Sequence, residues 1–238
     1  NDNALDSKLQ QTQSISSFSG APSFFTKTQL QALPKEKLLQ LAQAYVDNPT
    51  LEQLADDFIF RGPVIGPLNK QDFAATRRGV TGSNGIAEAF PDLEPNAFGF
   101  TADDPVEPNR VWYFQRSRGT FTGIFDHPVV GRIEPTGAEY VAPPEARSVI
   151  FNDDGLVRYQ SVGYVTDRFT GDTTGGRGAV FGLYAVMGQP LDDTVGSFWT
   201  SLLQKVATWL PEGTVPQSYS KPEQLPSWWK DPRMGAEK

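Results

Sequence analysis

The chain has 238 residues, enough for one large domain or for one domain with substantial extensions. It carries a formal net charge of −7, a single histidine and no cysteine. Disulfides, thiol nucleophiles and thiolate metal sites are therefore excluded, and an acidic surface disfavours binding to nucleic acid. Any chemistry must rest mainly on carboxylates, Tyr, Arg and Lys, and the sequence indicates no metal site and no cofactor.

No stretch of about 20 apolar residues occurs, so we expect no membrane-spanning helix. The 22 glycines and 19 prolines favour a turn-rich protein that contains strands over a helical bundle. The sequence begins at Asn1 and not at Met, which fits removal of a targeting segment and fits equally well a numbering that starts within the chain.

The first 27 residues are rich in Gln, Ser, Asn and Thr and are interpreted as an extended arm. From Thr28 the apolar spacing predicts a helix that ends before Pro49. A short helix over residues 50–55 and a strand over 57–64 follow. Asn69 is then a good N-cap for a helix that runs to about residue 78.

Three segments in the middle of the chain have strand patterns. Residues 110–119 alternate, with Trp112, Phe114 and Arg116 on one face and Val111 and Tyr113 on the other. Residues 138–151 end at an Asn-Asp-Asp-Gly turn, and residues 156–167 return as the second arm of a hairpin.

The C-terminal part contains two predicted helices. The first is a small apolar helix over residues 179–187. The second is capped by Asp192 or Asp193 and is strongly amphipathic, with Lys205 as its one charged residue. It either packs on the outer surface of the domain or docks on another protein or a membrane surface. Five aromatic residues are the candidate interaction residues of this helix and the tail that follows: Phe198, Trp199, Trp209, Trp228 and Trp229.

These elements predict an α+β domain. Phe-Arg-Gly-Pro at 60–63, Lys-Gln-Asp-Phe at 70–73, the segments 89–93 and 118–123, and the Asp-Gly hairpin that leads to Asp167 resemble SnoaL-like proteins of the NTF2-like superfamily. The resemblance covers residues 36–190. It implies a curved antiparallel sheet that wraps a helix as a cone with one deep apolar cavity. The arm is then 1–27, the domain 28–190 and the C-terminal helix and tail 191–238.

The pairing of Phe-Arg-Gly-Pro-Val with Phe-Pro-Asp-Leu is also similar to uncharacterised SnoaL-like proteins of photosynthetic eukaryotes, which implies a plastid location. Enzymes of the superfamily place an Asp, His or Tyr in the cavity. Asp167 matches the family's aspartate near the end of the last long strand, so it is the candidate general acid/base, with Tyr164 beside it. Phe121 stands where relatives often carry histidine, and His127 is expected in an exposed loop.

The resemblance further implies that Phe121, Trp112, Phe114, Arg116 and Arg147 line the pocket. An inward arginine would bind a carboxylate or phenolate. The alternative is a salt bridge to Asp57, Glu145 or Asp167, which would use up the charge.

We therefore expect a non-catalytic binding module, an accessory subunit of a larger assembly in a photosynthetic plastid, with other protein subunits as partners. The alternatives are a small-molecule isomerase or cyclase that uses Asp167, and a carrier of a hydrophobic small molecule. Nucleic acid is not expected as a partner, and peripheral contact with a membrane stays open.

Overall fold

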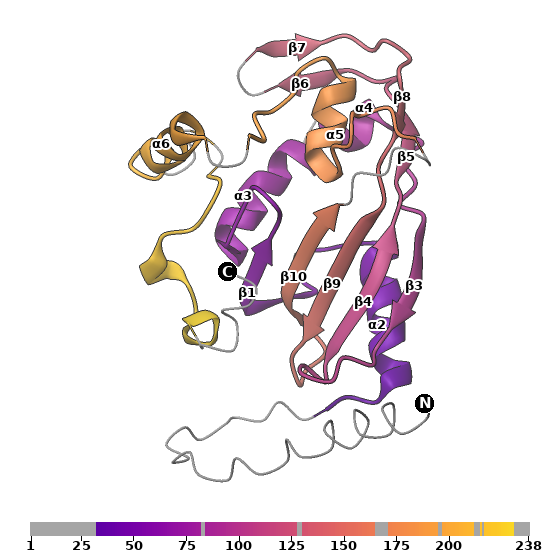
Figure 1. Ribbon diagram of the computed structural model, residues 1–238, viewed down its shortest axis with the longest axis vertical. Coiled ribbons are helices and arrows are strands. Elements are labelled where there is room, and N and C mark those ends of the chain that lie inside the picture. The colour runs from indigo at the N-terminus through magenta and orange to yellow at the C-terminus, as the bar shows by residue number, and fades with distance from the viewer. Residues whose placement is uncertain are drawn as a thin grey trace, which may run out of the picture. The chain divides into compact units, whose positions relative to one another are not determined.

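The computed structural model describes residues 32–81, 84–127, 130–164, 171–194, 197–211, 215 and 217–230. The predicted N-terminal arm, the candidate Asp167 and the side chain of Tyr164 lie outside this description. The described part confirms the predicted α+β class, with helices packed on a curved, mostly antiparallel sheet (Figure 1).

The central sheet has six strands, in the order β2 (Leu68–Asn69), β1 (Leu54–Arg61), β10 (Val157–Tyr164), β9 (Glu145–Phe151), β4 (Arg110–Gln115) and β3 (Ala97–Thr101). Two small sheets extend it, one of β5 (Arg118–Thr120) with β8 (Glu139–Val141) and one of β6 (Phe125–His127) with β7 (Gly131–Ile133). The described helices are α2 (Lys35–Asp47), α3 (Lys70–Thr81), α4 (Ile86–Ala89), α5 (Ala179–Val186) and α6 (Phe198–Ala207), with short 3₁₀ turns η1 (Pro222–Gln224) and η2 (Ser227–Lys230).

The hairpin of β9 and β10 forms as the sequence predicts. Its turn is held by the Asn152 side chain, whose Oδ1 accepts hydrogen bonds from the amides of Asp154 and Leu156, and Gly155 takes a φ of +79°. The unexpected pairing is between β1 and β10, which run parallel. It places the first strand beside the last and brings both ends of the domain into one sheet.

Several predicted boundaries change. The helix expected over residues 50–55 is wrong, because Leu54 and Ala55 are buried as the first residues of β1. The Asn69 cap of α3 is confirmed, since its Oδ1 accepts a hydrogen bond from the amide of Asp72 at 2.9 Å. The cap of α6 is Ser197, not Asp192 or Asp193, since the Ser197 hydroxyl oxygen accepts from the amide of Thr200.

The inner face of the sheet carries the larger core. Helix α2 buries Leu38, Ala42 and Tyr45 against it, which is the face its apolar spacing predicts. The buried Tyr45 hydroxyl donates a hydrogen bond to Gln160 Oε1 at 2.8 Å. Burial of a side chain such as Leu38 contributes roughly 1.5–3 kcal/mol, so this contact helps to fix α2 inside the curve of the sheet.

The outer face is covered in part by the end of the chain. Trp229 is 4% exposed and packs on Tyr159, and the Trp228 indole donates to the carbonyl of Asp57 at 3.0 Å. The guanidinium of Arg158 lies over the Trp228 ring. The two tryptophans therefore fold back on their own sheet. Trp229 in particular is wrong as an interaction residue, because its side chain is already buried in this chain.

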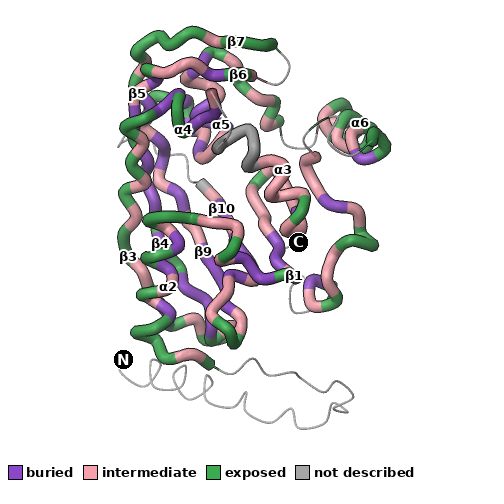
Figure 2. The backbone as a smooth tube through the Cα atoms, turned by 180° about the vertical axis from the view of Figure 1, so that it is seen from behind, coloured by how far each residue is buried: buried purple, intermediate pink, exposed green. Residues whose placement is uncertain are grey.

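Helix α6 has the opposite character. It lies apart from the sheet and is drawn mostly as exposed in Figure 2, whereas β9 and β10 are mostly buried. No residue of α6 is buried. One of the two predictions for this helix is that its apolar face packs on the outer surface of the domain. That prediction is wrong, because the apolar face is exposed.

Candidate functional site

A cluster of buried polar side chains lies on the inner face of the sheet, where the resemblance places a cavity. Glu145 and Arg147 are two residues apart on β9 and so point to the same side, and Tyr113 lies opposite Arg147 on β4. The Arg147 guanidinium donates to Glu145 Oε2 at 2.7 Å through Nε and forms an ion pair with it at 2.5 Å. We refer to Glu145, Arg147, Tyr113 and Tyr140 as the inner polar cluster.

The inner polar cluster makes further hydrogen bonds within the fold. The other carboxylate oxygen of Glu145 accepts the amide of Ala179 at 2.6 Å, at the N-terminus of α5. Arg147 also donates to the Tyr113 hydroxyl, and the Tyr140 hydroxyl reaches the carbonyl of Ala179. The cluster thus joins β4, β8 and β9 to α5.

Burial and charge shape the protonation of this cluster. Burial raises the pKa of Tyr113, and Arg147 opposes that rise only in part. Burial, and after it the charge of Glu145, raises the pKa of Tyr140 far above its usual value. Burial acts to lower the pKa of Arg147, but the neighbouring Glu145 outweighs it and keeps the pKa of Arg147 high. Both phenols are therefore neutral and the guanidinium is charged at physiological pH.

This arrangement leaves little capacity for chemistry. Glu145 is 0% exposed and the Arg147 side chain only 15%. The arginine that could bind a substrate carboxylate already holds Glu145, so the predicted salt-bridge alternative is confirmed for Arg147. One surface depression of about 390 Å³ lies near Lys70, and another of about 170 Å³ lies beside α6. Neither includes a residue of the inner polar cluster.

Phe121 lies beyond the cluster in a second apolar core. It is fully buried, stacks on Phe90 with ring centres 5.4 Å apart, and belongs with Tyr140 and Leu183 to one group of buried side chains. Its ring fills the interior of this group. Phe121 therefore contributes to packing and does not line an open pocket.

The sequence predicts His127 in an exposed loop, and this is wrong. It ends β6, its Nδ1 accepts the amide of Val130 at 3.1 Å, and its ring packs edge-on against Tyr184. Partial burial lowers the pKa of His127, which favours the neutral ring. The hydrogen bond to Nδ1 of His127 and the ring contact with Tyr184 place His127 between the small β6–β7 sheet and α5.

Trp112 and Phe114 are wrong as pocket residues. They occupy the outer face of β4 and are 39% and 48% exposed, whereas Val111 and Tyr113 point inward. Arg116 follows the last residue of β4 and donates to the carbonyls of Ala142 and Gly171. It therefore joins two loops, which is a structural role.

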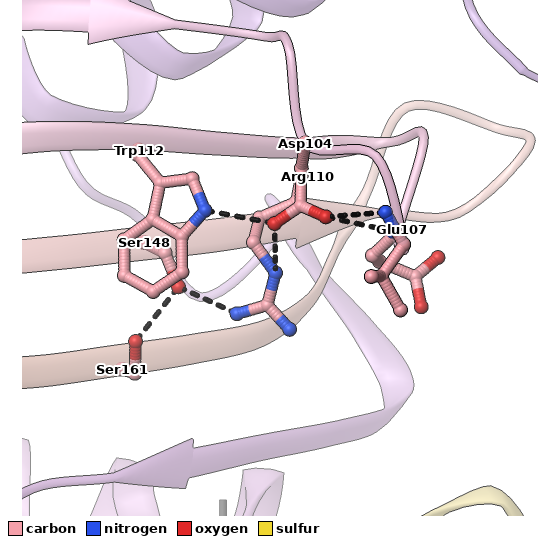
Figure 3. A network of polar contacts seen from close by, with 7 residues as sticks. Asp104, Glu107, Arg110, Trp112, Ser148 and Ser161 are labelled. Carbon is pink, nitrogen blue, oxygen red and sulfur yellow. Dashed lines mark hydrogen bonds and ion pairs between the residues drawn. The ribbon is translucent and has the colours of Figure 1, made fainter. Parts of the chain in front are cut away.

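The outer face holds a second polar network, around Arg110 (Figure 3). Asp104 Oδ2 pairs with Arg110 at 3.4 Å and accepts the Trp112 indole at 2.8 Å, while Asp104 Oδ1 accepts two backbone amides. Arg110 also donates to the Ser148 hydroxyl at 2.9 Å, which in turn bonds to Ser161. Burial opposes ionisation of Asp104, but these donors and the charge of Arg110 outweigh it and lower the pKa of Asp104. The network ties the 104–107 turn to the sheet.

Helix α6 presents its apolar face to solvent. Gln204 donates to the carbonyl of Val64, and the polar residues Ser197, Thr200, Ser201 and Gln204 line the depression beside Pro63 and Val64. The apolar residues point the other way. Phe198 and Trp199 are each 70% exposed, Leu203 is 68% exposed, and Trp209, just beyond the helix, is 76% exposed. We call Phe198, Trp199, Leu202, Leu203, Val206, Trp209 and Leu210 the apolar face of α6.

The chain was compared with proteins of known family, function and structure. No family model matches the sequence, and no protein with a curated function is similar to it. Among solved structures, it is similar to a protein classed as a SnoaL-like polyketide cyclase from Jannaschia sp., with 17% identity over 59% of this chain and 92% of the other and a TM-score of 0.41. A helix inside a curved sheet that pairs its first strand with its last is the arrangement found here. This arrangement agrees with the α+β class that the sequence predicts.

Two further solved structures have the same kind of likeness. The Δ5-3-ketosteroid isomerase from Mycobacterium sp. has 15% identity, covers 58% of this chain and 97% of the other, and has a TM-score of 0.36. An NTF2-like protein of unknown function from Exiguobacterium sp. has 10% identity, covers 56% and 98%, and has a TM-score of 0.34. No activity of these proteins follows for this chain.

Two further observations bear on partners and metals. No helix among the described residues is long and apolar enough to cross a membrane. In the same part of the chain, no three His, Asp or Glu side chains come together as a metal site would require.

Sequence reasoning named Glu145 only as a possible ion-pair partner and missed Tyr140 and Asp104. The signal for Glu145 was present, since Glu and Arg two residues apart on one strand face must interact if that face is buried. The contacts of Asp104 could not be predicted, because Asp104 lies in a turn before β4 and no strand or helix spacing relates it to Arg110 and Trp112.

Proposed function

We propose that this chain is a non-catalytic binding module that attaches to its partner through the apolar face of α6. The observation that carries the proposal is the orientation of this helix. Its polar side faces the domain, and its large apolar side chains face outward, with Trp199 and Leu203 about two-thirds exposed. Apolar surface of this extent is costly in water and marks an interaction site.

The inner polar cluster supports a binding role over a catalytic one. A general acid or base must reach a substrate, whereas Glu145 is bonded to Arg147 and to the amide of Ala179 and is fully buried. A substrate carboxylate would have to displace Glu145 from Arg147. The cluster is suited to hold α5 on the sheet, and α5 in turn covers the aromatic core around Phe121.

The proposal is tested in extracts of the native cells by density-gradient fractionation. The wild-type chain is expected to migrate with much larger particles than its own mass of 26.2 kDa allows. The variant Trp199→Ser/Leu203→Ser should move to the position of the free protein. The matched control is Phe98→Ser/Phe114→Ser, which removes two exposed aromatic rings from the outer face of the sheet.

The control variant should migrate as the wild type does. A wild-type chain that migrates alone, or two double variants that behave alike, would contradict the proposal. We further propose, from the narrower resemblance alone, that the protein works in a plastid as part of a photosynthetic assembly. Microscopy of the tagged full-length gene product tests the location.

A second candidate is a small-molecule isomerase, cyclase or carrier that uses Asp167. One observation favours it. Tyr164, the last residue of β10, pairs with Glu145, so Asp167 follows three residues after the strand position beside the inner polar cluster. Calorimetric titration with a hydrophobic enone, using Asp167→Asn as the matched variant, tests this candidate. Binding of the enone that is lost in the variant would favour this candidate. If the wild-type protein does not bind the enone, the docking proposal is the one that remains.

A further inference from the structure

We propose that the partner of α6 is the surface of an electrically neutral lipid bilayer, into which its apolar face inserts parallel to the membrane plane. This inference rests on the proposed function, because it names the partner of that same face. The deciding features are the width of the face, the presence of only one charged residue within α6, and the aromatic residues at both of its ends.

The first feature is the width of the apolar face. At 100° per residue, Phe198, Trp199, Leu202, Leu203 and Val206 spread over an arc of about 140°. A second copy of α6 could bury only the central ridge of such a face, because two convex helices meet along a narrow seam. A bilayer deforms around the helix and buries the whole arc, as it does for helices that lie in the interface.

The second feature is charge. Lys205 is the only charged residue within α6, and the side of the helix away from the apolar face carries Thr200, Ser201 and Gln204. These residues face Pro63 and Val64 of the same chain. The chain as a whole has a formal charge of −7, so an anionic membrane would repel it. A protein partner selected by charge pairs would find only Lys205 within the helix. A zwitterionic surface, with no net charge, fits both observations.

The third feature is the placement of aromatic side chains. Phe198 and Trp199 are the first two residues of α6, and Trp209 lies just beyond its last residue. The Trp209 amide donates to the Val206 carbonyl at 3.0 Å, so the chain still turns as a helix at this point. Tryptophan prefers the boundary between lipid headgroups and acyl chains. Tryptophans at both ends hold a helix level in that boundary, with Leu202, Leu203 and Val206 reaching into the acyl region between them.

The experiment is flotation of the purified full chain with phosphatidylcholine vesicles, repeated with vesicles that contain phosphatidylserine. We expect flotation with phosphatidylcholine and weaker flotation with phosphatidylserine. Raising the salt concentration should change the phosphatidylcholine result by less than about twofold, because little of the attraction is electrostatic. Trp199→Ser and Leu203→Ser should each lower the partition coefficient by about tenfold or more. The control Phe114→Ser should not lower it.

Each outcome decides one claim. Absence of flotation, or flotation that requires anionic lipid, overturns the lipid proposal. If flotation fails while Trp199→Ser/Leu203→Ser still releases the protein from large particles in native extracts, the docking function stands and its partner is a protein. If vesicles bind but the wild-type chain is free in native extracts, the proposed function fails. A dimer in solution that Leu203→Ser dissociates would replace the bilayer with a second copy of the chain.

Discussion

The ion pair of Glu145 and Arg147 permits a sharp test of whether the inner polar cluster is structural. The perturbation is Arg147→Met, which keeps an apolar stem of similar length and removes the guanidinium. Glu145 is then left fully buried, and the amide of Ala179 still donates to it at 2.6 Å. Removing one partner of a buried pair costs about 3–5 kcal/mol, because the other charge is left uncompensated. For a protein of this size this lowers Tm by roughly 6–20 °C.

The double variant Glu145→Gln/Arg147→Met completes the comparison. Gln keeps an oxygen that can accept the Ala179 amide, and no charge remains buried. We expect it to be more stable than Arg147→Met alone by about 2 kcal/mol. Thermal and urea unfolding followed by circular dichroism measure both differences. Arg132→Met is the control, because Arg132 forms an exposed pair with Glu134 and its removal should change nothing measurable.

A neutral or stabilising effect of Arg147→Met would refute a structural role for the pair. Such an effect is what a strained catalytic site produces when it is removed. Equal stability of the single and double variants would also refute the reasoning, because it would mean that the unpaired Glu145 finds water.

Three further predictions concern other parts of the fold. The pKa of Asp104 is lowered from 3.8 despite burial, so its carboxylate stabilises the protein above that pH and the effect is lost as pH falls through the folded-state pKa. Asp104→Asn should therefore lower the free energy of unfolding by about 1.5–3 kcal/mol at neutral pH and by progressively less in acid. The same difference between wild type and variant at every pH would contradict this. Trp229→Ala should cost about 3–5 kcal/mol because its ring is buried on Tyr159, whereas the exposed Trp209→Ala should stay within about 0.5 kcal/mol; comparable losses would be inconsistent with the fold-back of the tail. Gly123→Ala would place a Cβ 1.9 Å from the Glu88 carbonyl oxygen and should destabilise by about 1–3 kcal/mol in the same unfolding assay, so an unchanged Tm would disprove that contact.

The sequence predicted the fold well because its strongest signals are local. The Asn152–Gly155 turn needs a residue with positive φ, and Gly155 supplies it. The Asn69 cap and the apolar spacing of α2 likewise depend on neighbours within one or two turns. The short helix expected before β1 failed because burial of Leu54 in the sheet overrode its local pattern.

The choice of faces could not be predicted in the same way. Alternation in β4 separated Trp112 and Phe114 from Val111 and Tyr113, but both sets are apolar or aromatic. Only the packing of α2 on one side decides which set is inside. For α6 the sequence indicates a clear apolar side, yet the orientation of the helix depends on the contact of Gln204 with Val64, 140 residues earlier. The role of Asp167 remains a prediction.

The central claim is that the apolar face of α6 is occupied when the protein works. The natural chain contains no cysteine, so Leu203→Cys introduces a unique reactive group. In the purified protein Cys at this position should react quickly with a water-soluble maleimide, because Leu203 is 68% exposed. In native cells opened gently, the same cysteine should be protected, while Phe114→Cys stays reactive. Equal reactivity of the Leu203→Cys protein in the two settings would contradict the account.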